Sequence, residues 1–146
     1  MLTNHKELHD YANLYFNARN PMMYYLINHK DINNLCVICI DKTILNLYDT
    51  VVADGNASAQ MTMFESPEHA LNYLNFGKIY QKYWTSTNVL EENENKRIQC
   101  AEVLVPNFIS SKYIKGIYVY SEEAMQKVIN LNLNIPVKIY KDIFFG

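Results

Sequence analysis

Residues 96–119 read KRIQCAEVLVPNFISSKYIKGIYV, and the run AEVLV within this stretch is short and apolar enough to be a strand. Strand alternation places Glu102 on one face with Cys100 and Leu104, and the alanine and valines of the run on the other. An ionised carboxylate among apolar neighbours is costly unless it is paired or its pKa is raised. Glu102 is therefore a candidate functional residue, and the alternative is a glutamate on an edge strand that leans into solvent.

Further short apolar runs predict four more strands, at Leu35–Ile40, Thr50–Ala53, Ile114–Tyr120 and Val137–Tyr140. Helices are predicted between them, at Asp41–Leu47, Pro67–Leu74, Phe76–Tyr83 and Glu122–Asn130. The last helix has the clearest signature, because Ser121 is a natural N-cap and acidic residues follow it. Strands mixed irregularly with short helices indicate an α+β fold.

Two segments lack a sustained period. The first twenty residues are rich in Tyr, Asn and Phe, and they predict either a structured functional loop or a strand interrupted by turns. The segment Glu91–Lys96 is acidic, rich in Asn and devoid of apolar residues, so we expect a mobile surface loop there.

Length and composition restrict the class of protein. With 146 residues, 49% of them hydrophobic, and no repeat or linker, the chain is expected to form one domain over residues 1–146. A net charge of -2 excludes the clustered basic surface of a non-specific nucleic-acid binder. No stretch approaches the ~20 apolar residues that span a bilayer, and no signal core opens the chain, so a cytoplasmic protein without membrane contact is expected.

The three cysteines predict neither a disulfide framework nor a metal site. Cys36 and Cys39 form a C-x-x-C, but residues three apart on a strand point to opposite faces and do not easily share a metal ion. Cys100 is expected to be a small core residue. We therefore expect no metal.

Two other places have chemical potential. Arg19 lies in an aromatic segment before Pro21, and its planar fork suits phosphates or carboxylates, although a plain surface arginine is the alternative. The segment Asp54–Ser58, DGNAS, combines turn-forming and small residues that allow a ligand to approach the backbone. Neither of the glycine-rich phosphate-binding loops with known mechanics occurs.

Three segments together resemble the DarT family of DNA ADP-ribosyltransferases, the toxins of systems whose antitoxin carries an ADP-ribose-removing macrodomain. They are LHDYANLYFNARNPMMY from Leu8, VVADGNASAQMTMF from Val51, and the 96–119 stretch, in the family's order and spacing. The resemblance implies a mixed fold with two small β-sheets around an NAD cleft and short peripheral helices. It also implies that ADP-ribose passes from NAD to a base in single-stranded DNA, typically thymine.

The resemblance also implies roles for individual residues. Glu102 matches the catalytic glutamate, which would hold the ribose 2′-hydroxyl and stabilise an oxocarbenium-like transition state. Arg19 matches the family arginine that helps to orient or activate the base. The remaining matches are to NAD for Tyr15, Phe16 and Asn17, and to the DNA substrate for Asn56, Lys96 and Arg97. The last two belong to the stretch 85–99, which matches the loop that presents the substrate.

One departure from the family pattern concerns the start of the chain. Family members carry, before the LHDY segment, a strand with a His-containing NAD-binding motif and a helix, whereas LHDY here begins at Leu8. His5 and His9 do not stand in that motif, so neither is assigned to NAD. A truncated chain, an element supplied by a partner, and a degenerate member that no longer turns over are the three explanations.

Two hypotheses compete with the DNA-modifying enzyme. One is a catalytically silent relative or fragment that binds nucleic acid or a protein partner, which the departure at the N-terminus motivates. The other is transfer of ADP-ribose to RNA, protein or a small metabolite, since no residue pattern identifies the acceptor directly.

Overall fold

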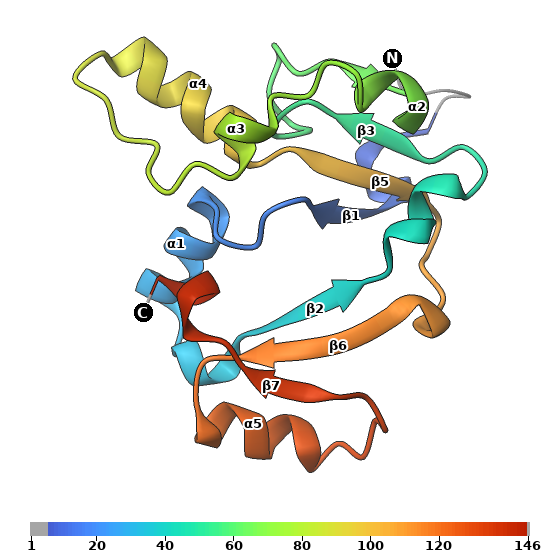
Figure 1. Cartoon of the computed structure of the whole chain (residues 1–146), viewed down its shortest axis with the longest axis vertical. Coiled ribbons are helices and arrows are strands. Elements are labelled where there is room, and N and C mark those ends of the chain that lie inside the picture. Colours follow the sequence, from blue (N-terminus) through green and yellow to red (C-terminus); the bar gives the residue numbers. More distant parts are fainter. Residues whose placement is uncertain (1–5, 146) are drawn as a thin grey trace.

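The computed structural model describes residues 6–145, so His5 lies outside the described residues. Within these residues, seven strands form two small sheets, which Figure 1 shows one above the other. The strands are β1 (Tyr11–Tyr15), β2 (Cys36–Ile40), β3 (Val51–Ala53), β4 (Phe64–Glu65), β5 (Glu102–Pro106), β6 (Ile114–Val119) and β7 (Val137–Ile139). This arrangement confirms the α+β class with two sheets.

Short helices surround the sheets: α2, α3 and α4 lie above the first sheet in Figure 1, and α5 lies below the second. The α-helices are α1 (Pro21–His29), α2 (Pro67–Ala70), α3 (Phe76–Ile79), α4 (Val89–Gln99) and α5 (Glu122–Ile129), and the 3-10 turns are Leu8–Asp10, Ile32–Asn34, Lys42–Asn46, Ser111–Tyr113 and Lys141–Phe144. Within residues 6–145, no helix has the length and apolar character needed to cross a membrane.

The first sheet has the order β1-β5-β3-β4, so β5 is a central strand with antiparallel neighbours on both sides. Glu102 pairs with Tyr15 of β1 and with Ala53 of β3. Its side chain is 6% exposed. The alternative of an edge-strand glutamate that leans into solvent is therefore wrong.

The two faces of β5 contribute to different clusters, as the alternation predicted. Ala101, Val103 and Val105 belong to the main core, together with residues from α2 and α3. Leu104, two residues from Glu102, packs with Tyr11, Val51, Ala53 and Ala57. The carboxylate therefore shares its face with a small second cluster, next to the loop that follows β3.

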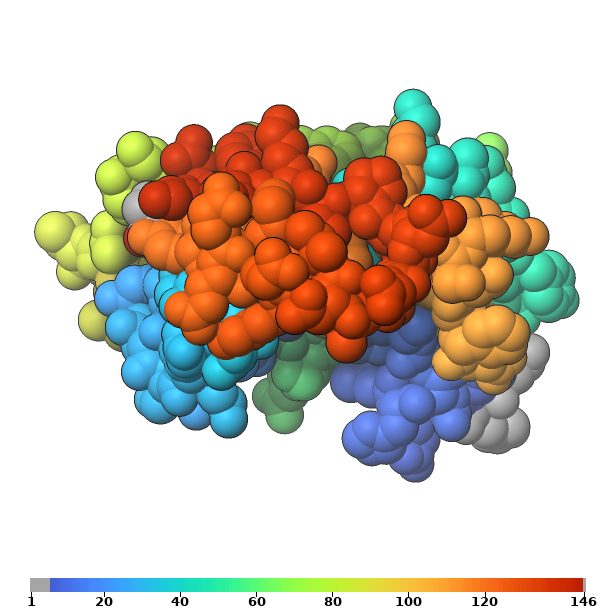
Figure 2. Space-filling view, turned by 90° about the horizontal axis from the view of Figure 1, so that it is seen from below, coloured from blue at the N-terminus to red at the C-terminus, as the bar shows by residue number. Residues whose placement is uncertain are grey.

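The second sheet has the order β2-β6-β7, with an antiparallel and a parallel pairing. Helix α5 packs on it through Ala124, which joins Ile117 and Val119 in a third cluster. Figure 2 shows that the C-terminal part of the chain forms the centre of this outer face. Ser121 caps α5 by accepting from the Ala124 N–H, as its sequence predicted.

The N-terminal segment is an ordered strand followed by bends and a helix. Between β1 and α1, Asn20 is extended and its side chain accepts from the Met23 N–H, which makes it the N-cap of α1. Pro21 occupies the first helical position, where its missing N–H has no cost. The interrupted strand was one of the two predicted alternatives, and the helix was not predicted.

The mobile loop predicted at Glu91–Lys96 is wrong, because these residues form the middle of helix α4. Asn88 caps its N-terminus, acidic residues fill the first turn, and Lys96 pairs with Glu92 one turn earlier at 2.9 Å. The buried face of α4 carries Asn95 and Gln99, so apolar periodicity is absent. Hydrophobic periodicity does not reveal a helix whose buried side chains are amides, so α4 could not be recognised in this way.

The other predicted helices are shorter than expected. The segment Asp41–Leu47 contains a 3-10 turn rather than an α-helix, and the helices predicted from Pro67 and Phe76 each last four residues. Runs of this length bury only one or two side chains, such as Ala70 and Ile79, so little tertiary packing favours their extension.

Candidate active site around Glu102

The carboxylate of Glu102 is held by two donors. The backbone N–H of Ala57 donates to Oε2 at 2.6 Å, and the side chain of Asn13 donates to Oε1 at 3.3 Å. A carboxylate has about four acceptor positions, so these two donors leave it capacity for a ligand hydroxyl. A ribose hydroxyl is a hydrogen-bond donor, so it suits the acceptor positions that remain.

Burial raises the pKa of Glu102 above its ordinary value of 4.5, and the hydrogen bonds from Ala57 and Asn13 act in the opposite direction. Tyr15, directly across from Glu102 on β1, has its pKa raised to about 12 by burial and by the charges of Glu102 and Cys100. The pKa of the Cys100 thiol is raised to about 11, mainly by burial. Both neighbours are therefore neutral at physiological pH.

Strand alternation brings Tyr15 and Asn13 to the same side of the sheet as Glu102, because the register pairs Tyr15 with Glu102 and Asn13 with Leu104. Tyr15 is 41% exposed, so part of this residue is accessible beside the carboxylate. Tyr15 was predicted from the sequence. Asn13 was missed, although its position two residues before Tyr15 was the available signal.

The loop that follows β3 is built from hydrogen bonds within itself. Asp54 accepts from the Met63 N–H at 2.9 Å, and the side chain of Asn56 accepts from the N–H and hydroxyl of Ser58 at 3.0 and 2.7 Å. The Asn56 side chain, predicted to contact substrate, is thus engaged inside the loop. The contact between Ala57 and Glu102 was not foreseen from the sequence.

Arg97 lies on α4 with its side chain 13% exposed. It contacts Asp54 at 2.9 Å and grips both oxygens of Glu94 at 2.7 and 2.9 Å. These acidic partners raise its pKa further above its ordinary value. A guanidinium that already pairs with two carboxylates is poorly suited to a DNA phosphate, so the predicted contact of Arg97 with DNA stays an untested prediction.

Lys96, the other cation predicted to contact DNA, forms an ion pair of its own. Its ammonium pairs with Glu92 at 2.9 Å, and its side chain is 42% exposed. An exposed pair of this kind contributes at most ~0.5 kcal/mol and opens readily. Lys96 is therefore available to an anionic ligand in a way that Arg97 is not.

Arg19 precedes α1 and is partly buried. Its Nη1 donates to the carbonyl of Lys82 at 2.5 Å, and its guanidinium lies over the ring of Phe145, 4.0 Å from the centroid. Within residues 6–145, no carboxylate forms an ion pair with it. Its positive charge therefore lacks an acidic partner there, which separates it from an ordinary surface arginine in a salt bridge.

Phe16 and Asn17 have contacts within the protein, and their contact with NAD stays a prediction. The ring of Phe16 packs against the main core and meets Phe76 edge to face, with centroids 6.1 Å apart. The Asn17 side chain accepts from the N–H of Arg19 at 3.0 Å and donates to the carbonyl of Ile79 at 3.0 Å. Both side chains stabilise the turn that positions Arg19.

The inner face of α4 fixes the irregular segment 81–84, which contacts Arg19. Asn95 donates to the carbonyl of Trp84 at 3.3 Å, and Gln99 donates to the carbonyl of Gln81 at 3.1 Å. These amides flank the Lys82 carbonyl that accepts from Arg19. One helix therefore supports the surroundings of Arg19 with its buried face and those of Glu102 through Arg97.

Metal chemistry has no cluster of ligands in the part of the chain that the structure describes, where no three His, Cys, Asp or Glu side chains gather. Cys36 is exposed, Cys39 is partly buried and Cys100 is buried, the last as predicted. His9 is exposed in a 3-10 turn.

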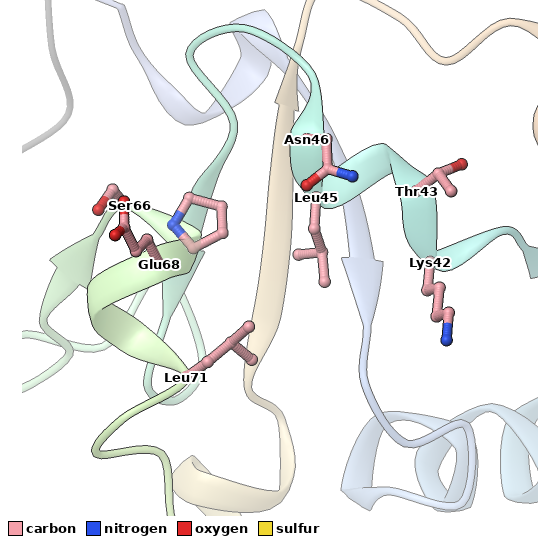
Figure 3. A pocket seen from close by; sticks show the side chains of 8 residues that line it. Lys42, Thr43, Leu45, Asn46, Ser66, Glu68 and Leu71 are labelled. Carbon is pink, nitrogen blue, oxygen red and sulfur yellow. The ribbon is translucent and has the colours of Figure 1, made fainter.

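A cavity of about 530 Å³ lies between the turn Lys42–Asn46 and α2 (Figure 3). Its lining contains none of the predicted site residues and consists of Lys42, Thr43, Leu45, Asn46, Ser66, Pro67, Glu68 and Leu71. In Figure 3 its polar side chains point in different directions rather than toward one another. The candidate chemistry therefore lies at Glu102 and not in this cavity.

Comparison with known proteins gives a consistent set of similarities. The chain is 34% identical over 150 residues to a DNA ADP-ribosyl transferase-DNA ADP-ribosyl glycohydrolase fusion protein of Thermosipho africanus, with 99% of this chain and 37% of the fusion protein covered. A solved structure of Thermosipho africanus DarTG in complex with ADP-ribose matches with a TM-score of 0.79 and 32% identity, over 99% of this chain and 38% of that one. The chain thus spans well under half the length of these relatives.

Two structures of Thermus sp. 2.9 DarT share the fold at 21% identity, over 95% of this chain. The complex with ADP-ribosylated ssDNA gives a TM-score of 0.82 over 70% of that chain, and the complex with carba-NAD+ gives 0.83 over 75%. The family model described as "DarT: ssDNA thymidine ADP-ribosyltransferase, DarT" matches residues 2–145. With its Glu102 site on a fold shared with these proteins, the chain belongs to the DarT family of ssDNA thymidine ADP-ribosyltransferases.

Proposed function

We propose that this protein transfers ADP-ribose from NAD to a base, typically thymine, in single-stranded DNA. The observation that carries the proposal is Glu102, a carboxylate buried on a central strand, held by a backbone N–H and left with free acceptor capacity. Family membership supports the reaction class. The solved complexes of the Thermosipho protein with ADP-ribose and of the Thermus protein with ADP-ribosylated ssDNA and carba-NAD+ support NAD and single-stranded DNA as the substrates.

In the proposed reaction NAD supplies an activated ribose, whose bond to nicotinamide breaks with the electron pair leaving on nicotinamide. Glu102 accepts a hydrogen bond from a ribose hydroxyl and places a negative charge beside the developing positive charge. The hydrogen bonds from Ala57 and Asn13 favour the ionised carboxylate, against the burial that raises its pKa. Tyr15, neutral and half exposed next to it, offers a ring face to the bound substrates.

The base forms its new bond to the ribose carbon that nicotinamide leaves, and the proton that the base loses passes to water. A cation near a thymine N–H favours the deprotonated base, because opposite charge lowers a pKa. Arg19 fits this role, since its guanidinium has no acidic partner among the described residues and is oriented by Lys82 and Phe145. Lys96, with its weak exposed ion pair, fits a contact to a DNA phosphate.

The biological role proposed here rests on the family. We infer that the protein acts as a bacterial toxin and that its partner is a macrodomain that removes ADP-ribose from DNA. Support comes from the Thermosipho africanus relative, whose name joins a DNA ADP-ribosyl transferase to a DNA ADP-ribosyl glycohydrolase in one chain.

The test is transfer of label from NAD to a mixed-sequence single-stranded oligonucleotide, with Glu102→Gln as the matched variant. Glutamine keeps the shape and one acceptor oxygen but removes the charge. We expect transfer by the wild type and a loss of about 10²–10³-fold in Glu102→Gln, the usual cost of removing one electrostatic contributor. Full activity of a folded Glu102→Gln would contradict the proposal.

The same labelling assay includes RNA and protein acceptors. Binding of NAD is measured separately by calorimetry. Label on RNA or protein alone would replace the acceptor and keep the transferase. Binding of DNA or a partner without binding of NAD would favour the silent relative instead.

A further inference from the structure

A chain of hydrogen bonds connects Arg97 to Glu102 through the loop after β3. Arg97 Nη1 donates to the hydroxyl of Thr62 at 3.1 Å, and this hydroxyl donates to the carbonyl of Asn56 at 2.6 Å. The same peptide unit carries the N–H of Ala57, which donates to Glu102 Oε2 at 2.6 Å. Every donor in this chain points toward the carboxylate.

The direction of the chain matters electrostatically. A guanidinium at one end polarises the Thr62 hydroxyl and the peptide unit, so that the last N–H becomes a better donor. The carboxylate at the other end is the group whose charged form this arrangement stabilises. Thr62 is 8% exposed and Glu102 is 6% exposed, so water competes little along the path.

The loop is pressed against Arg97 with no space for a side chain. The backbone carbonyl of Arg97 accepts from the N–H of Asn56 at 2.9 Å. A Cβ added at Gly55 would lie 2.4 Å from Arg97 Nη1 and 2.9 Å from the Arg97 carbonyl oxygen. Asp54 meanwhile contacts the same Nη1 at 2.9 Å. These close contacts fix the position of the loop on α4, and with it the direction of the Ala57 N–H.

We propose that Arg97 is a positioning residue for Glu102, acting through Thr62 and the Asn56–Ala57 peptide unit rather than through contact with DNA. The inference rests on the proposed function for its kinetic consequences, but the hydrogen-bond relay itself is testable without any activity. Helix α4 thereby orients the catalytic carboxylate from a distance of one loop.

The structural test follows the amide proton of Ala57 by NMR while pH is lowered. In the wild type this proton should shift as Glu102 takes up a proton, because the acceptor of its hydrogen bond loses charge. Tyr15 and Cys100 face Glu102 but have raised pKa values of about 12 and 11, so neither titrates in the acid range. The loop's own carboxylate, Asp54, bonds to the Met63 N–H and to Arg97 rather than to Ala57.

Two pairs of variants separate the relay from general damage. Thr62→Val removes the hydroxyl while Thr62→Ser keeps it, and Arg97→Ala is compared with Lys127→Ala, which removes a cation of α5 paired with Glu123. We expect Thr62→Val and Arg97→Ala to lose most of the Ala57 titration shift. Thr62→Ser and Lys127→Ala should retain it.

The kinetic arm uses transfer to single-stranded DNA by the same variants. By analogy with outer partners that orient metal ligands, Thr62→Val and Arg97→Ala should lower kcat about 10- to 100-fold with KM for DNA unchanged. Loss of the Ala57 hydrogen bond raises the pKa of Glu102, so the acid limb of the rate profile should move to higher pH. Thr62→Ser should recover both kcat and the wild-type profile.

The inference is overturned if the Ala57 amide titrates normally in folded Thr62→Val. It is also overturned if the effect of Arg97→Ala lies in KM for DNA and grows with salt, which would indicate a phosphate contact. Failure of the wild type to transfer ADP-ribose would contradict the proposed function, and the NMR arm would still decide on the relay.

Discussion

The chain has two arginines, and the structure places them in opposite electrostatic situations. Arg97 lies between Asp54 and Glu94, and both carboxylates form ion pairs with its guanidinium. Arg19 lies on the ring of Phe145 and bonds to a carbonyl, without an acidic partner within residues 6–145. An arginine whose charge is already satisfied builds structure, whereas one whose charge is unsatisfied remains available for an anionic ligand or an ionising base.

Replacement of Arg19 by lysine or alanine should have the largest effect, and it should be on catalysis. We expect transfer of ADP-ribose to fall about 10²–10³-fold, the usual cost of losing one group that stabilises developing charge. The free energy of unfolding should change by less than ~1 kcal/mol, since the native contacts of Arg19 are one hydrogen bond to a carbonyl and ring stacking. Labelling kinetics and urea unfolding measure the two quantities.

Lys138→Ala, a loss of one exposed cation on β7, is the control for charge. An Arg19 variant that unfolds easily but, once folded, transfers at the wild-type rate would reverse the assignment of the two arginines.

Replacement of Arg97 by alanine should, in contrast, reduce stability. The side chain of Asp54, 17% exposed in the native protein, would lose its cation. Removing one partner of a buried pair costs ~3–5 kcal/mol, and the partial exposure here brings the expected loss to about 2–3 kcal/mol of the free energy of unfolding. Urea unfolding measures it. A loss below that of Arg19→Ala would show that the two ion pairs contribute little.

Gly55→Ala should disturb the seating of the loop on Arg97 without removing any charge. A methyl group would lie 2.4 Å from Arg97 Nη1, so the guanidinium or the loop must move. Overpacking of this kind costs about 1–3 kcal/mol. Thermal unfolding and the transfer rate should both fall, and Gly77→Ala, where a Cβ meets only Asn75 at 3.5 Å, is the matched control. Equal behaviour of the two variants would contradict close packing at Gly55.

Glu94→Gln should have the smallest effect, because Glu94 is 47% exposed. An exposed ion pair is worth ~0.2–1 kcal/mol and is screened by salt. The hydrogen bond and charge of Arg97 lower the pKa of Glu94 below its ordinary value of 4.5. Its stabilisation is therefore present above that value and disappears as pH falls through the lowered pKa.

The measurement is the difference in unfolding free energy between the wild type and Glu94→Gln at neutral and acid pH. That difference should shrink in acid and in high salt. A difference that persists under both conditions would mean that Glu94 stabilises the helix by packing instead of charge.

Much of the fold could be predicted from local patterns. The five apolar runs are strands in the structure, and α5 begins at its predicted cap. Strand alternation correctly placed Glu102 on the same face of β5 as Leu104 and on the opposite face from Val103. These successes share a cause, since side-chain period and capping depend on neighbours in the chain.

The predictions failed where burial was polar or pairing was distant. Helix α4 was taken for a loop because its inner face buries Asn95 and Gln99 instead of apolar residues. Strands β1 and β4 have no apolar run of their own, and β1 depends on β5, which lies about ninety residues further along the chain. Strand pairing across such separations has no local signature.

The candidate site divides in the same way. By itself the sequence determined that Glu102 sits in a strand among apolar neighbours, that Arg19 lies in an aromatic segment before Pro21, and that residues 54–58 turn. Only the tertiary structure decided that Ala57 holds Glu102 across 45 residues and that Arg97 is tied to Asp54 across 43. The physical reason is that charge neutralisation and desolvation depend on which groups the fold brings within a few ångströms, and sequence spacing does not contain that information.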